Sequence, residues 1–144
     1  MAGDLDSIYR RLAVCAYEDI GLANPGMGPK VDACINICEM LGLPEARIPL
    51  ATVVIELALS PKTNSSIVAI DKALADIEAG NTGNVPSHIK TSSKEYKYPH
   101  NYRGGFVRQQ YLPDNIKDRK YYVPKETSKY EKALKEVYDK LTYK

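Results

Sequence analysis

The sequence contains none of the short motifs that most directly indicate a nucleotide-binding or hydrolytic site. It has no Gly-x-x-x-x-Gly-Lys-Ser/Thr phosphate loop, no Gly-x-Ser-x-Gly elbow and no His-Glu-x-x-His helix. The stretch 21–30 comes nearest to a phosphate loop, but it lacks the glycine–lysine step that brings the lysine to the phosphates. We therefore expect this chain to have no catalytic residues, no cofactor and no metal of its own.

Cysteine and long apolar runs are also scarce. The three cysteines are an odd number, which fits a reducing cytosol better than a disulfide framework. Cys34 and Cys38 have helical i, i+4 spacing, but neither the third cysteine nor a histidine has zinc-finger spacing to them, so we expect core residues. The longest mostly apolar stretch, Leu50–Leu59, is far too short to cross a bilayer, and the N-terminus lacks the features of a signal peptide. These features favour a cytoplasmic protein without membrane contact.

Candidate acid–base groups are few. Glu18 and Asp19 are adjacent, and neighbouring helical residues point in different directions, so their carboxylates do not converge on one atom. An ion pair with Arg10 or Arg11, or a contact with a neighbouring subunit, is the favoured role of this pair. His100 has no nucleophile or orienting carboxylate beside it, which argues against catalysis.

Charge and tyrosine are distributed unevenly along the chain. Residues 1–80 carry a net charge of −5, whereas residues 81–144 carry +7 and nine of the eleven tyrosines. A basic, aromatic surface can bind nucleic acid by neutralising phosphates and stacking on bases. The simpler interpretation is a solvated basic face with packed tyrosines, and we favour it because Lys and Glu alternate near the C-terminus.

Helical periodicity dominates the first eighty residues and returns at the end of the chain. The pattern predicts a helix from Leu5 to about Asp19 that is capped by Asp4 or Asp6 and ends at Gly21. Three further helices are expected over residues 29–41, 50–59 and 67–77, and a last one over 128–142. The helix over 50–59 is apolar nearly all round, which predicts a central, buried element, and the next carries a stripe of Ile67, Ile70, Ala73, Leu74 and Ile77.

We expect all-α architecture in one domain. Residues 4–80 are predicted to form an antiparallel array of four helices, residues 81–126 an irregular aromatic and basic segment packed on it, and residues 127–144 a C-terminal helix. A short strand pair near Gly104–Gly105 and Tyr121–Val123 is the only extended structure that the pattern allows. An irregular segment this long is more often functional or interfacial than idle.

The most distinctive stretch is Tyr96–Pro113, which has neither helical nor strand periodicity. We expect its rings to fix the segment onto the helices, with Gly104 and Gly105 forming a turn; a stacking surface for single-stranded DNA is the alternative. Together with Glu18 and Asp19, the candidate structural or interface residues are Tyr98, His100, Tyr102, Gly104, Gly105, Phe106, Gln110 and Tyr111.

An ordered series of uncommon motifs resembles the C-terminal region of the RarA/MgsA family of AAA+ ATPases, which are relatives of the Werner helicase-interacting protein. The motifs are Tyr17-Glu-Asp-Ile-Gly-Leu-Ala-Asn-Pro25, Leu43-Pro-Glu-Ala-Arg-Ile-Pro-Leu50, Leu57-Ala-Leu-Ser-Pro-Lys-Thr-Asn64, Tyr98-Pro-His-Asn-Tyr102 and Gln109-Gln-Tyr-Leu-Pro113. The resemblance covers nearly the whole chain. Between His88 and Tyr96, however, the family usually has a longer linker.

The resemblance implies a fragment of a longer protein whose AAA+ module, absent here, holds ATP and Mg²⁺. It implies a helical domain similar to the collar of clamp-loader subunits, which joins the ATPase into a homotetramer. The full proteins of this family are DNA-dependent ATPases of replication forks, recombination and repair. The implied partners are DNA and single-strand-binding protein, and the implied location is the cytoplasm, at the nucleoid.

Overall fold

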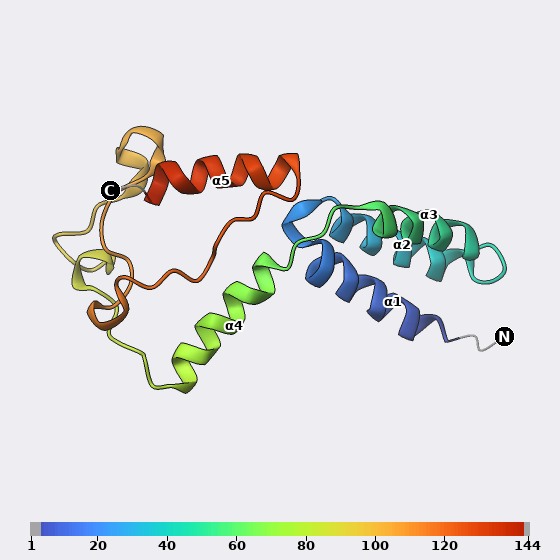
Figure 1. Ribbon diagram of the computed structural model, residues 1–144, viewed down its shortest axis with the longest axis horizontal. Helices are drawn as coiled ribbons and strands as arrows, with labels where there is room; N and C mark the ends of the chain where they lie inside the picture. The colour runs from blue at the N-terminus through green and yellow to red at the C-terminus, as the bar shows by residue number, and fades with distance from the viewer. Residues whose placement is uncertain (1–3, 143–144) are drawn as a thin grey trace. The chain divides into compact units, whose positions relative to one another are not determined.

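The computed structural model describes residues 4–142, and its regular elements there are all helical (Figure 1). The long helices are α1 (Leu5–Val14), α2 (Met27–Leu41), α3 (Arg47–Leu59), α4 (Ser65–Glu78) and α5 (Lys129–Thr142). A π-helical turn, Cys15–Ile20, continues α1, and a 3-10 turn, Gly21–Ala23, follows it. The predicted all-α class is therefore confirmed.

The predicted strand pair is wrong. Gly104 and Gly105 both have positive φ, at 79° and 64°, and belong to a short 3-10 turn, Arg103–Gly105. Residues 121–123 are not part of a strand, and no strand occurs anywhere within residues 4–142. Two successive glycines at positive φ turn the chain sharply, so no extended partner forms on that side.

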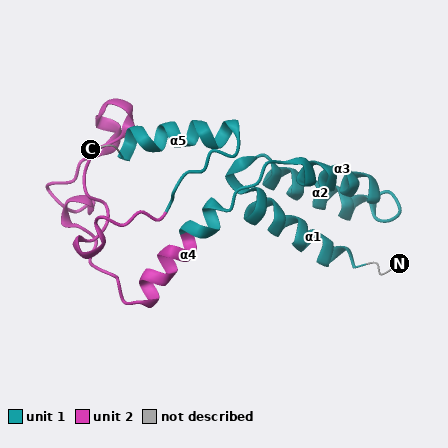
Figure 2. Cartoon of the chain, in the orientation of Figure 1, with its two compact units in different colours: residues 1–69, 122–144 teal, residues 70–121 magenta. Residues whose placement is uncertain are grey.

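The chain divides into two compact units. Residues up to 69 and from 122 onward form unit 1, and residues 70–121 form unit 2 (Figure 2). The boundary passes through α4, so the division differs from the boundaries that we predicted at residues 80 and 126. That residues 81–126 pack on the helical array stays a prediction.

The core of unit 1 lies among α1, the π-helical turn, α2 and α3. Apolar residues at helical spacing turn inward from each element, and cysteines fill two positions on α2. The buried set is Tyr9, Leu12, Ala16, Ile20, Met27, Val31, Cys34, Cys38, Ala46, Val53 and Leu57. The prediction that Cys34 and Cys38 are core residues is confirmed.

Local signals set the ends of the first helical run as expected. The carboxylate of Asp4 caps α1 by accepting a hydrogen bond of 3.0 Å from the backbone N–H of Ser7. The run ends at Gly21, whose φ is +48°, although its last six residues are π-helical rather than α-helical. A side chain at Gly21 would be strained at this φ, and its Cβ would lie 3.3 Å from the carbonyl oxygen of Thr63.

The prediction that the third helix is central and buried is wrong. Of the residues of α3, only Val53 and Leu57 are buried, because the packed neighbours α2 and the π-helical turn cover one side of it. The helix also begins at Arg47, three residues before the predicted start, with Pro49 in the first turn, where its missing N–H is tolerated.

Helix α4 is even less covered. Its only buried residue is Ser65, and three members of its predicted stripe, Ile70, Leu74 and Ile77, are exposed. Helix α2 packs against both α1 and α3, whereas α4 buries only Ser65. That the four helices form one array stays a prediction.

Unit 2 is held largely by polar contacts among its own residues, some of them to backbone carbonyl oxygens. His88 Nε2 donates to the carbonyl oxygen of Gln110 at 2.7 Å, and Asn115 Nδ2 donates to that of Thr82 at 2.9 Å. Asp76 on α4 accepts from Asn81 at 3.0 Å and pairs with Arg119 at 3.2 Å. The buried apolar side chain of this unit is Val107.

Candidate functional site

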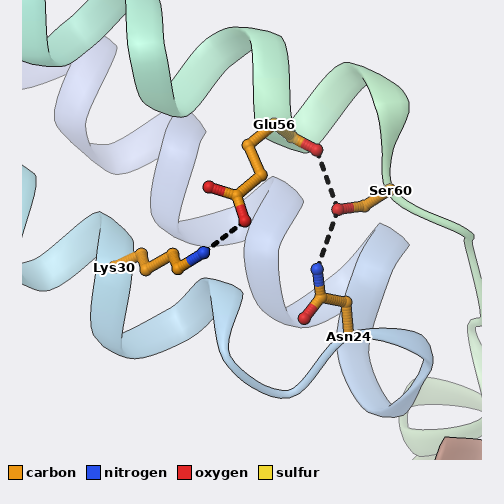
Figure 3. Close-up of polar contacts among 4 residues, drawn as sticks. All are labelled: Asn24, Lys30, Glu56 and Ser60. Atoms are coloured by element: carbon orange, nitrogen blue, oxygen red, sulfur yellow. Dashed lines mark hydrogen bonds and ion pairs between the residues drawn. The ribbon is translucent and has the colours of Figure 1, made fainter.

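A polar network ties the end of α3 to α2 and to the turn before it (Figure 3). Lys30 on α2 forms an ion pair with the carboxylate of Glu56, the one acidic residue of α3. Ser60 Oγ donates to the carbonyl oxygen of Glu56 at 2.8 Å and accepts from Asn24 Nδ2 at 3.1 Å. These contacts engage Glu56. Apart from Arg47 and Thr52, the remaining side chains of α3 are apolar.

The exposed side of α3 carries an apolar stripe, which we call the α3 outer face: Ile48, Ala51, Ile55 and Leu59. Their spacing of three, four and four residues places them on one side of the helix, opposite Val53 and Leu57. Ile48 is 62%, Ile55 59% and Leu59 81% exposed. Soluble monomers seldom leave large contiguous apolar patches open, so this face is a candidate interface.

More apolar surface is open around the end of α2. Ile37, Met40 and Leu41 on this helix are exposed, as is Leu43 in the connection to α3. The residues of α2 that face the core are Met27, Val31, Cys34 and Cys38, so the exposed set lies away from it. Unit 1 therefore leaves apolar side chains open on both α2 and α3.

Glu18 and Asp19 lie exposed on the π-helical turn. The backbone carbonyl oxygen of Asp19 accepts a hydrogen bond of 2.9 Å from the N–H of Thr63. Within residues 4–142 neither carboxylate forms an ion pair with Arg10 or Arg11, so the predicted intrahelical partners are not engaged. The contact with a neighbouring subunit stays a prediction.

The aromatic segment leaves most of its candidate rings open to solvent. Tyr98 is 51% and Tyr102 44% exposed, and His100 is exposed as well. The rings of Tyr98 and His100 touch, with centroids 5.1 Å apart and planes tilted by 48°. Phe106, by contrast, is half-buried beside the buried Val107. That these rings fix the segment onto the helices stays a prediction.

Gln110 and Tyr111 have clear structural roles. Gln110 Nε2 donates to the carbonyl oxygen of Leu112 at 2.9 Å and to a carboxylate oxygen of Asp114 at 2.7 Å. Tyr111 Oη donates to the carbonyl oxygen of Val107 at 2.7 Å. Gln110 and Tyr111 thus hold the backbone of this segment, although Tyr111 is 46% exposed, much like Tyr102.

Sequence reasoning missed the most heavily hydrogen-bonded side chain, Glu131 at the start of α5, which is fully buried. Its carboxylate accepts from Thr63 Oγ1 at 2.8 Å, Ser65 Oγ at 3.2 Å, Thr127 Oγ1 at 2.6 Å and the Thr127 N–H at 3.2 Å. Burial alone would raise the pKa of Glu131, but these hydrogen bonds outweigh it and hold the pKa below its ordinary value of 4.5.

A signal for Glu131 was present in the sequence. Ser128 and Glu131 have the Ser-x-x-Glu spacing of a capping box, and Ser128 Oγ accepts from the backbone N–H of Glu131 at 3.1 Å. The spacing predicts the helix start. It does not predict the contacts with Thr63 and Ser65, which come from a distant part of the chain.

Cys34 and Cys38 are buried thiols close to each other. The Sγ atoms of Cys34 and Cys38 lie 3.9 Å apart. Burial, together with Cys38, raises the pKa of Cys34 to about 11, so this side chain stays a thiol at neutral pH. In the part of the chain that the structure describes, no group of three or more His, Cys, Asp or Glu residues could hold a metal ion. None of the helices found there is long and apolar enough to cross a membrane.

These observations describe an all-helical domain whose distinctive side chains are surface groups, apolar on α3 and aromatic in unit 2. The family model described as "MgsA AAA+ ATPase C terminal" matches residues 1–142. The chain therefore belongs to the C-terminal domain family of the MgsA AAA+ ATPases, as the sequence motifs indicated.

Individual relatives support this family assignment. The replication-associated recombination protein A of Bacillus subtilis is 60% identical over 150 aligned positions, covering 97% of this chain and 36% of that protein. An AAA domain-containing protein of Mycobacterium tuberculosis is 39% identical, covering 81% of this chain and 28% of its own length. The replication-associated recombination protein A of Escherichia coli is 28% identical, covering 85% and 30%.

The chain spans about a third of the length of these curated relatives. The 150 positions aligned with the Bacillus protein exceed the 144 residues of this chain, so that relative has residues in the matched region that are absent here. The shorter linker between His88 and Tyr96 stays a prediction.

Proposed function

We propose that this chain is the assembly domain of a DNA-dependent AAA+ ATPase and joins copies of its parent into a homotetramer through the α3 outer face. The observation that carries the proposal is the stripe of Ile48, Ile55 and Leu59, which lies open on a helix whose opposite side is packed. Homo-oligomers usually close by symmetry, and because one self-complementary surface closes only a dimer, a homotetramer needs a second contact surface on each copy.

The free energy of burying these side chains indicates how strongly two copies would associate. Burying an Ile or Leu side chain contributes about 1.5–3 kcal/mol, and these three residues already bury part of their surface. Two copies facing each other would gain roughly 6–12 kcal/mol from six such side chains, against an association cost of about 4–15 kcal/mol. The α3 outer face is therefore marginal alone, and we assign an auxiliary role to the exposed Ile37, Met40, Leu41 and Leu43.

The wider role follows from the family. We propose that the parent protein maintains replication forks and acts in recombination and repair, with DNA and single-strand-binding protein as partners in the cytoplasm, at the nucleoid. The names of the Bacillus and Escherichia relatives support the role in replication-associated recombination. ATP and Mg²⁺ belong to the AAA+ module, so the collar-like domain described here has no ATPase activity of its own.

The test is light scattering of this chain over a range of concentrations. We expect the mass to approach that of a tetramer as concentration rises, and the double variant Ile55→Glu/Leu59→Glu to stay monomeric with an unchanged circular dichroism spectrum. The control is Val137→Glu, which places the same charge at a 52% exposed apolar site on α5 and should assemble normally. A monomeric unsubstituted chain at high micromolar concentration, or equal disruption by Val137→Glu, would contradict the proposal.

A further inference from the structure

We propose that the exposed aromatic segment of unit 2 binds single-stranded DNA. Bases would stack on Tyr98, His100 and Tyr102, while Lys94, Lys97 and Arg103 neutralise the phosphates. This inference rests on the proposed function, in which DNA is a partner of the parent protein, and it assigns that partner to a surface of unit 2 rather than to the α3 outer face.

The first argument is that these rings are open to solvent. Tyr98 and Tyr102 are about half exposed, and His100 is exposed, whereas Tyr111 of the same segment commits its hydroxyl to the backbone of Val107. The planes of Tyr98 and His100 are tilted by 48° rather than stacked in parallel. Ring faces left open in this way are what an unpaired base requires.

The second argument is charge. Residues 94–108 carry four Lys or Arg side chains and one acid, Glu95, for a net charge of +3. Lys94, Lys97 and Arg103 are exposed, and none of them forms an ion pair within the described residues. Their positive charge is therefore available to phosphates, which dominate the affinity of proteins for nucleic acids.

The third argument is access. Gly104 and Gly105 follow Arg103 directly, both are exposed, and a Cβ added to either would meet nothing within 4 Å. A turn of two glycines has no side chains to cover the backbone next to the aromatic residues. A sugar–phosphate chain can therefore approach this turn closely.

The same features favour a single strand over a duplex. Stacking on protein rings needs base faces that a duplex keeps buried, so a duplex could use the charges but not the rings. An acidic peptide of a replication protein would also use the charges, and the experiment below separates it from DNA.

The experiment is fluorescence anisotropy with labelled oligothymidylate of about 16 nucleotides, the upper site size of one compact binding module. We expect Tyr98→Ala and Tyr102→Ala each to weaken binding about tenfold, the effect of losing one stacked base. Arg103→Gln should reduce the salt dependence of the affinity by about one phosphate contact.

Matched controls come from unit 1. Tyr17→Ala removes a tyrosine that is 67% exposed, and Arg47→Gln removes an exposed arginine, so both should bind like the unsubstituted chain. A duplex of the same sequence length should bind more weakly and should not respond to Tyr98→Ala. The Ile55→Glu/Leu59→Glu variant should still bind, which separates this proposal from the assembly role.

Three outcomes would overturn the proposal. The first is no binding of the oligonucleotide at low salt. The second is an equal loss of binding in Tyr17→Ala, or a fall in melting temperature in the ring variants with unchanged affinity of the folded protein, which would mean that the rings support the fold. The third is ring-dependent binding of an acidic, aromatic peptide without binding of DNA, which would assign the surface to a protein partner.

Discussion

At the scale of single residues, Glu131 shows how a buried charge stabilises this fold. Burial of a carboxylate costs free energy unless its oxygens accept hydrogen bonds. Glu131 receives such bonds from Thr63 just before α4, from Ser65 at the start of α4 and from Thr127 before α5, all within unit 1. The carboxylate therefore joins two parts of the chain that are more than sixty residues apart.

We predict that Glu131→Gln lowers the free energy of unfolding by about 2–3 kcal/mol. Hydrogen bonds to a charged group contribute about 1.5–3 kcal/mol, and the amide places an N–H₂ group where Glu131 has an acceptor. Urea unfolding followed by far-UV circular dichroism measures the change. Glu136→Gln on the exposed side of α5 is the control and should change the stability by less than about 0.5 kcal/mol.

The stabilisation by Glu131 should also depend on pH. Because its pKa in the folded state lies below the ordinary 4.5, the contribution is fully present above that pH and is lost as pH falls through the folded pKa. The stability difference between the unsubstituted chain and Glu131→Gln should therefore be constant near neutrality and shrink under acid conditions. A difference that grows as pH falls would show that the carboxylate is not the stabilised form.

At the scale of elements, the sequence predicts where helices begin and end better than which of their faces are covered. Asp4 and Gly21 act on the backbone next to them, so their signals can be read locally. The exposure of the α3 outer face and of the stripe on α4 depends on which neighbours are present, which periodicity alone does not encode.

We predict that α4 exchanges its amide hydrogens much faster than α2. Only Ser65 of α4 is buried, whereas α2 buries five residues, so local opening of α4 exposes little apolar surface and costs little free energy. Hydrogen exchange read by mass spectrometry or NMR measures this difference.

The monomeric variant Ile55→Glu/Leu59→Glu provides the comparison for α4. If α4 is protected like α2 in the unsubstituted chain but not in this variant, then assembly covers its stripe. Equal protection of both helices in the variant would contradict the prediction, because it would place Ile70, Leu74 and Ile77 in a covered position within a single copy.

At the scale of the whole molecule, family membership was predictable because it depends on the amino-acid sequences of the motifs, which are spread over both units. The surfaces themselves were only partly predictable. The sequence singled out Gln110 and Tyr111, but their contacts with Asp114 and Val107 are seen only in the structure. The motifs indicate which residues characterise the family. The contacts show whether those residues stabilise the fold or remain available to a partner.

The last prediction is that this chain does not bind Mg-ATP with measurable affinity. A phosphate loop supplies backbone N–H groups and a lysine that hold the β- and γ-phosphates, and the sequence has no such loop. Binding that reached a hundredfold excess over Kd would stabilise the fold by about 2.7 kcal/mol and raise the melting temperature by roughly 10 °C. We therefore expect thermal melts with and without millimolar Mg-ATP to coincide, with Mg²⁺ alone as the control, and isothermal titration to show no heat of binding. Micromolar affinity in that titration would contradict the assignment of ATP to the AAA+ module, and the phosphate contacts would then have to come from the basic side chains of residues 81–144.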